Sequence, residues 1–151
     1  MKTGLFAGTF DPFTIGHDSI VRRALPLFDR LVIGVVGDNV NKPGMSPANQ
    51  RVAAIRQLYA GLAAIDVKVY NGLTVDFARA EGAQFLVKGV RSVKDFEYER
   101  EMADINRRLA DVETVLLYAE PELASISSSM VRELQHFGRD VSPFIPQPTQ
   151  R

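Results

Sequence analysis

The residues from Gly8 to His17 have the types and spacing of a loop that binds nucleotide phosphates. The apolar run from Lys2 to Ala7 predicts a strand, Asp11-Pro12 predicts a turn, and Gly16 permits a close approach where His17 begins a helix. Unpaired amide N–H groups and the positive end of the helix dipole then meet at one point, which favours anions. The His17 side chain adds a further hydrogen-bond donor there.

Short glycine-containing turns occur in many folds, and a single histidine near a helix start is commonly a cap or a surface residue. The loop is not a Walker loop, because the Gly-Lys-Ser/Thr triplet is missing, and it is not the Gly-x-Gly-x-x-Gly dinucleotide motif. Its chemistry therefore has to be supported by other segments.

Two other segments have the residue types of a phosphate site. The serines at 127–129 stand at a predicted helix start, where one serine would suffice as a cap, and Arg132 follows one turn later. Three serines and an arginine are typical of a phosphate-binding nest. Lys88 ends an apolar strand, which is a costly place for a charge unless the lysine is paired or faces a ligand.

Apolar runs rich in β-branched residues alternate with helical patterns along the chain. The predicted strands are 2–7, 30–36, 65–70, 85–88 and 114–118. The predicted helices are 17–28, 47–60, 74–81, 94–109 and 127–137. Ser46 is expected to cap the second helix, and Pro26 is expected to end the first one early.

This alternation predicts an α/β fold, a doubly wound, Rossmann-like parallel sheet of five strands with helices on both faces. The strands 30–36 and 85–88 are apolar enough to be interior. Ligands of such sheets bind beyond the carboxyl ends of the strands. Residues that follow predicted strand ends, and are therefore expected to converge, are Thr9, Lys42, Leu73 with Thr74, Lys88 to Arg91, and Ser127.

Composition predicts one domain over residues 1–151, with 46% hydrophobic and 24% charged residues. Lys plus Arg and Asp plus Glu number 18 each, so no net charge attracts nucleic acid or an anionic membrane, and a phosphate site must be a local cluster of cations. The chain has no cysteine, and we find no cage of carboxylates for a metal. The apolar run at the start of the sequence is too short for a signal peptide, and no apolar run has membrane-spanning length.

Taken together, these segments resemble the nucleotidylyltransferase superfamily. Residues 14–17, Thr-Ile-Gly-His, match its (T/H)-x-G-H signature, and residues 126–132 match Ile-Ser-Ser-(Ser/Thr)-x-x-Arg. Lys88 to Arg91, followed by Asp95 to Glu99, is similar to the internal signature of the bacterial phosphopantetheine adenylyltransferases. The resemblance covers nearly the whole chain.

The resemblance implies transfer of the adenylyl group of ATP to 4′-phosphopantetheine, giving dephospho-coenzyme A and pyrophosphate. The acceptor phosphate attacks the α-phosphorus, so the protein must orient two anions and needs no nucleophile. His17 is implied to stabilise the α-phosphoryl group and Lys42 to bridge it to the acceptor phosphate. The family also implies Mg²⁺ carried by the ATP phosphates, a cytoplasmic location and a homohexamer that is a dimer of trimers.

The matching positions imply the substrate contacts. For phosphopantetheine they are Thr9, Lys42, Leu73, Thr74, Lys88 and Asn106. For ATP they are Thr9, Phe10, His17, Gly89, Val90, Arg91, Glu99, Leu123, Ala124, Ser125, Ile126, Ser127, Ser128, Ser129 and Arg132. The family typically has Arg where this chain has Lys88, which keeps the charge and loses the bidentate fork, and many members have a larger apolar residue at the position of Thr74.

Other functions are compatible with the same motifs. A relative such as a nicotinamide mononucleotide adenylyltransferase or a cytidylyltransferase shares both end motifs, whereas residues 88–91 and 96–99 favour the phosphopantetheine branch. A non-catalytic nucleotide-binding module is disfavoured by His17, Lys42 and Arg132. A flavodoxin-like interaction domain would not be stabilised by ATP.

Overall fold

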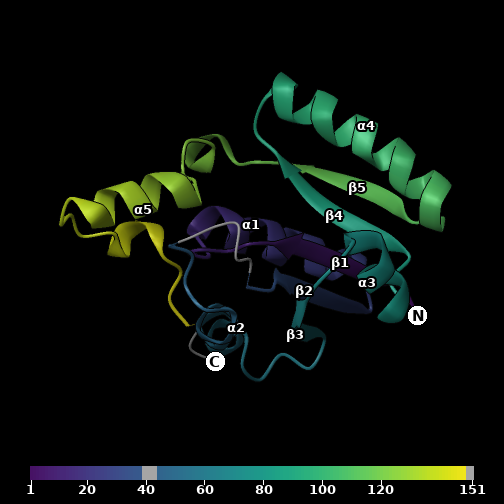
Figure 1. The fold of residues 1–151 in the computed structure, drawn as a ribbon, viewed down its shortest axis with the longest axis horizontal. Helices are drawn as coiled ribbons and strands as arrows, with labels where there is room; N and C mark the ends of the chain where they lie inside the picture. The colour runs from purple at the N-terminus through teal and green to yellow at the C-terminus, as the bar shows by residue number, and fades with distance from the viewer. Residues whose placement is uncertain (39–43, 149–151) are drawn as a thin grey trace.

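Five parallel strands form one sheet in this computed structural model, which describes residues 1–38 and 44–148. The strands are β1 (Thr3–Gly8), β2 (Arg30–Val36), β3 (Ile65–Tyr70), β4 (Phe85–Val90) and β5 (Glu113–Tyr118), in the order β3-β2-β1-β4-β5. The chain adds β2 and β3 on one side of β1 and then crosses to place β4 on the other side (Figure 1). Such a reversal of strand order creates a crevice for ligands beyond the carboxyl ends of β1 and β4.

The helices pack on both faces of this sheet. They are α1 (Ile15–Ala24), α2 (Ala48–Leu58), α3 (Thr74–Ala80), α4 (Val93–Ala110) and α5 (Ser128–His136). Short 3₁₀ turns cover Leu25–Leu27, Pro121–Leu123 and Ser142–Phe144. Figure 1 shows α5 at the left, apart from the other helices and beyond the sheet.

Two hydrophobic cores hold the layers together, because successive side chains of a strand point to opposite faces. Ile33 of β2 lies in the core that α1 and α2 cover, with Ile20 and Ile55. Val32 and Leu5 lie in the core on the other face, with Val75 of α3. The strands 30–36 and 85–90 flank β1 and are interior, as their apolar sequences predict.

The predicted fold class and all five strands are confirmed, with strand ends that differ by at most two residues. The first helix starts at Ile15 and stops at Ala24, because Pro26 forces the following residues into a 3₁₀ turn. The predicted cap at Ser46 is wrong. Pro47 is the N-cap of α2, and the Ser46 N–H instead donates to Asp11 Oδ2 at 3.0 Å. Within the described ranges, no helix is both long and apolar enough to cross a bilayer.

Candidate active site

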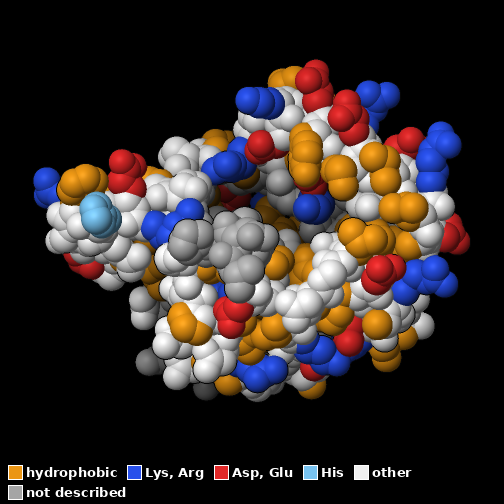
Figure 2. All heavy atoms as spheres, in the orientation of Figure 1, with side chains coloured by type: hydrophobic (Ala, Val, Ile, Leu, Met, Phe, Trp, Pro, Cys, Tyr) orange, Lys and Arg blue, Asp and Glu red, His pale blue; other side chains and the backbone are white. Residues whose placement is uncertain are grey.

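A pocket of about 500 Å³ opens at the carboxyl ends of β1 and β4. Its walls come from the β1–α1 loop, the first turns of α1, the end of β4, α4 and the segment 119–128. In the space-filling view, the surface below α4 is hollowed, with Lys or Arg and Asp or Glu side chains at its rim (Figure 2). The pocket therefore occupies the place that the strand order predicts for a ligand.

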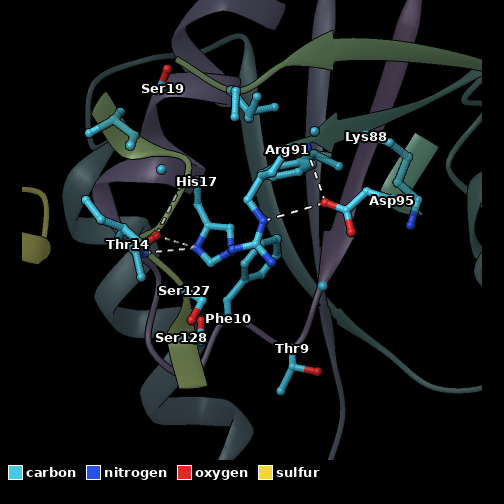
Figure 3. Close-up of a pocket in the computed structure, with 18 of the residues that line it drawn as sticks. Thr9, Phe10, Thr14, His17, Ser19, Lys88, Arg91, Asp95, Ser127 and Ser128 are labelled. Carbon is cyan, nitrogen blue, oxygen red and sulfur yellow. Dashed lines mark hydrogen bonds and ion pairs between the residues drawn. The ribbon is translucent and has the colours of Figure 1, made fainter. Parts of the chain in front are cut away.

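The β1–α1 loop fixes the orientation of His17. Thr14 is the N-cap of α1, and its side chain accepts the His17 N–H. His17 Nδ1 in turn accepts the Thr14 backbone N–H at 2.9 Å and lies 3.2 Å from Thr14 Oγ1. Because Nδ1 uses its lone pair in this way, the neutral imidazole carries its proton on Nε2. Nε2 lies on the opposite side of the ring, toward Arg91 (Figure 3).

Burial among aromatic rings and the nearby positive charge of Arg91 lower the pKa of His17 to about 4. The ring centroids of Phe10 and Phe13 lie 5.0 and 5.2 Å from that of His17. His17 is therefore uncharged at neutral pH and offers the pocket one Nε2–H donor. The sequence leaves this protonation state open.

Glycines let the backbone approach closely on both sides of this loop. A Cβ on Gly8 would lie 3.0 Å from the ring of Phe10. The Phe10 backbone has a φ of 53°, in the left-handed region. A Cβ on Gly16 would lie 3.4 Å from Thr14 Oγ1 and 3.8 Å from the carbonyl oxygen of Ile126. A side chain at position 8 would therefore press on the Phe10 ring, whereas the distances at Gly16 are ordinary packing contacts with Thr14 and with the segment before α5.

The end of β4 brings two cations to the pocket, each held by a carboxylate of α4. Lys88 Nζ lies 3.3 Å from Glu99 Oε2, and Glu99 is only 9% exposed although its helix is rich in charge. Arg91 Nε lies 3.6 Å from Asp95 Oδ2, which also accepts the Arg91 backbone N–H. The carboxylate partner of Lys88 is therefore Glu99.

The start of α5 closes the pocket on the side of the β1–α1 loop. Ser127 caps the helix by accepting the Met130 N–H, and Ser128 Oγ donates to the Pro12 carbonyl oxygen at 2.7 Å. Arg132 Nη1 donates to the Asp11 carbonyl oxygen at 2.6 Å, and its Nη2 donates to Ser129 Oγ at 3.2 Å. Arg132 thus holds α5 against the loop.

Most residues predicted for the site meet in this pocket. Those that line it are Thr9, Phe10, His17, Lys88, Gly89, Arg91, Glu99, Leu123, Ile126, Ser127 and Ser128. Described residues that were predicted but stand outside the lining are Leu73, Thr74, Val90, Ala124, Ser125, Asn106, Ser129 and Arg132. Lys42 lies outside the described residues.

The structure shows where four of the residues outside the pocket lining lie. Val90 is buried in the sheet, Leu73 is exposed at the N-cap of α3, and Thr74 Oγ1 shares a hydrogen bond of 2.8 Å with the Tyr70 hydroxyl. Ala124 lies next to the pocket, where its carbonyl oxygen accepts from Arg91 Nη1 at 3.5 Å.

Five polar lining residues were given no site role from the sequence. Thr14, Asp95 and Tyr98 stand within the quoted signatures, whereas Ser19 and Glu120 stand outside them. The sequence does contain an indication for Asp95, since Ser92 caps α4 by accepting the Asp95 N–H and places the carboxylate one turn from Arg91.

Among the described residues, no group of three or more His, Cys, Asp or Glu side chains is arranged to hold a metal ion.

Comparison with known proteins defines the class first. Residues 5–134 match the family described as cytidylyltransferase-like. A solved structure, that of the lipopolysaccharide core biosynthesis protein from Thermoplasma volcanium GSS1, has a similar fold, with a TM-score of 0.57 over 80% of this chain and 97% of that chain. At 20% sequence identity, that likeness concerns the fold alone.

Curated relatives narrow the class. Phosphopantetheine adenylyltransferases of Phocaeicola vulgatus and Bacteroides fragilis are 56% and 53% identical over 147 residues, which is 97% of this chain and 97% of each relative. The enzyme of that name from Leuconostoc citreum is 45% identical over 97% of this chain and 93% of its own length. The chain belongs to the phosphopantetheine adenylyltransferase family.

Proposed function

We propose that this protein transfers the adenylyl group of ATP to 4′-phosphopantetheine, giving dephospho-coenzyme A and pyrophosphate. Family membership supports this activity, because the match with a curated relative covers 97% of the chain. The structural observation that carries the proposal is the neutral His17, whose Nε2–H lies in a pocket with Lys88 and Arg91. A donor and two cations suit a reaction between two anionic phosphates.

In the proposed reaction, an oxygen of the acceptor phosphate forms a bond to the α-phosphorus of ATP. The bond from the α-phosphorus to the bridging oxygen breaks, and its electron pair leaves with pyrophosphate. His17 Nε2–H donates to an α-phosphoryl oxygen, where negative charge must be stabilised during the displacement. The protein supplies orientation and hydrogen bonds and forms no covalent intermediate.

We assign the expected contact residues to an acceptor side and an ATP side. On the acceptor side we place Thr9 and Lys88 of the pocket, together with Lys42, Leu73, Thr74 and Asn106 from the family pattern. On the ATP side we place Thr9, Phe10, His17, Gly89, Val90, Arg91, Glu99, residues 123–129 and Arg132. The charge of Arg91 acts on His17, and its side chain lies beside the His17 ring (Figure 3), which suits a contact to the α- and β-phosphates.

Mg²⁺ is proposed to enter with the nucleotide. The carboxylates Asp95 and Glu99 are already paired with Arg91 and Lys88, so the described residues suit an ion whose ligands are phosphate oxygens and water. The ion would offset negative charge on the pyrophosphate as it leaves.

The choice of acceptor tests this function. Purified protein with ATP and Mg²⁺ should release pyrophosphate with 4′-phosphopantetheine, and should form ATP from dephospho-coenzyme A when pyrophosphate is added. Pantetheine without its phosphate is the matched control and should give no release, because the phosphate oxygen that attacks is absent. Activity with nicotinamide mononucleotide and none with phosphopantetheine would contradict the proposal. Binding of ATP without turnover of any acceptor would favour a binding module instead.

We further propose a cytoplasmic homohexamer, built as a dimer of trimers. Apolar side chains are exposed along α4, among them Val93, Phe96, Ile105 and Leu109, and burial between subunits would remove them from water. Light scattering at micromolar concentration should give six times the 16.7 kDa chain mass. A monomeric mass would contradict this assembly.

A further inference from the structure

Arg51 of α2 is a buried cation that none of the motifs predicted. The residue is 5% exposed, whereas arginine side chains usually reach water. Its nearest described carboxylate is Asp38, whose Oδ1 lies 3.5 Å from Nη2 and whose side chain is 72% exposed. So long and partly solvated an ion pair compensates little of the cost of burying a charge. The remaining hydrogen bonds of the guanidinium must offset that cost.

Those hydrogen bonds join three segments behind the pocket. Nη1 donates to the carbonyl oxygens of Thr9 at 2.8 Å and Val36 at 2.7 Å, and Nε donates to that of Ser46 at 2.8 Å. The pairing of β1 with β2 ends at Gly8 and Val35, so Arg51 binds the first carbonyl beyond the last pair on each strand. The two hydrogen bonds of Nη1 thus take the place of the β1–β2 backbone hydrogen bonds where the two strands separate.

The Thr9 carbonyl is a sensitive place for such a bond. The next residue, Phe10, has a φ of 53°, a conformation that is unfavourable for a side chain of this size and that the surrounding structure must hold. The ring of Phe10 packs edge-on against His17 with centroids 5.0 Å apart. A shift of the Thr9–Phe10 peptide would therefore move three pocket residues, Thr9 and Phe10 directly and His17 through the Phe10 ring.

We propose that Arg51 is a positioning residue for adenylyl transfer, whose guanidinium sets the Thr9–Phe10 turn and through it the acceptor site and His17. This inference rests on the proposed function and assigns to that site a residue that does not itself line the described pocket. Arg51 makes these bonds from two separate nitrogens, Nε and Nη1, whereas lysine carries all its donors on one atom, so lysine should not reproduce them.

Arg51→Lys keeps the charge and removes the fork. We expect kcat to fall about tenfold to a hundredfold, because small misplacements of reacting groups have effects of that size, while the Kd for ATP changes less than about threefold. Arg56→Lys is the matched control. Arg56 lies on the same helix and donates to the Val67 carbonyl oxygen through Nε and Nη2, but outside the pocket lining. It should lower the melting temperature without lowering kcat.

A double-variant cycle separates positioning from general stability. If Arg51 acts through Thr9, Arg51→Lys should reduce kcat much less in a Thr9→Val background than in the wild type. Arg51→Gln, which removes the buried charge, is the second variant and should show the same loss in kcat. Normal kcat in a folded Arg51 variant, full additivity with Thr9→Val, or failure of both Arg51 variants to fold would overturn the proposal. All assays use the acceptor that the wild-type protein turns over, so failure of the proposed function would appear in the wild type.

Discussion

Replacing His17 by alanine should lower kcat by about a hundredfold or more while the Kd for ATP changes much less. The reason is that Nε2–H is placed to stabilise charge that develops in the transition state, and one such donor supplies about 3–4 kcal/mol. Rapid-quench measurement of turnover and calorimetric titration with ATP separate the two quantities. Equal losses in both would mean that His17 only binds substrate.

A second variant controls for helix stability. His17 stands three residues after the N-cap Thr14 and accepts its backbone N–H, so alanine also removes half of a capping box. His17→Gln can restore that contact, because glutamine is a usual residue at this position of the box. We expect His17→Gln to recover the melting temperature and only part of the lost turnover. Recovery of turnover in proportion to stability would assign the effect of alanine to the cap.

The low pKa of His17 gives the pH dependence of the free enzyme. With a pKa of about 4, His17 stays neutral as the pH falls from 8 to 5, so its ionisation should not lower kcat/KM in that range. A histidine of ordinary pKa would instead titrate near pH 6.5.

Replacing Lys88 by alanine should weaken phosphopantetheine binding about ten- to a hundredfold. A hydrogen bond to a charged group contributes about 1.5–3 kcal/mol, which corresponds to that range of affinity. Lys88→Arg should leave the Kd unchanged or lower it, because guanidinium can donate two parallel hydrogen bonds to one phosphate. The Kd for ATP should change less, since we assign its phosphates to Arg91 and the serines.

The ion pair between Lys88 and Glu99 requires a further variant, because alanine at position 88 leaves a buried carboxylate without its cation. Glu99→Gln combined with Lys88→Ala removes that charge. If Lys88 binds the acceptor, the double variant should regain melting temperature and keep the weak phosphopantetheine binding. If Lys88 only neutralises Glu99, acceptor affinity in the double variant should be normal, which would remove Lys88 from the acceptor site.

The sequence predicts the sheet well because strand runs such as 31–35 are buried on both faces and are apolar throughout. It also places the phosphate loop, since Gly8, Gly16 and His17 have local backbone reasons to stand where they do. The protonation state of His17 depends on the Phe10 and Phe13 rings and on Arg91, which come together only in the folded chain.

Two other residues show why the rest was not predicted. By composition, Glu99 belongs to a solvated helix face, but Lys88 of β4 and the packing of α4 leave it buried. Arg51 sits in an ordinary amphipathic helix pattern, and its partners are backbone carbonyl oxygens 5, 15 and 42 residues away. Carbonyl positions leave no trace in residue types, so a buried arginine of this kind requires the structure.

The central claim is that adenylyl transfer is direct and that His17 acts as a donor. Its Nδ1 is occupied by the Thr14 N–H and its Nε2 carries a proton, so the neutral ring has no free lone pair to attack ATP. The stereochemical course at the α-phosphorus, measured with a single diastereomer of ATP that carries sulfur on that phosphorus, tests this most directly. One displacement predicts inversion of configuration in the dephospho-coenzyme A analogue. Retention would require two displacements through an adenylylated enzyme and would contradict the account.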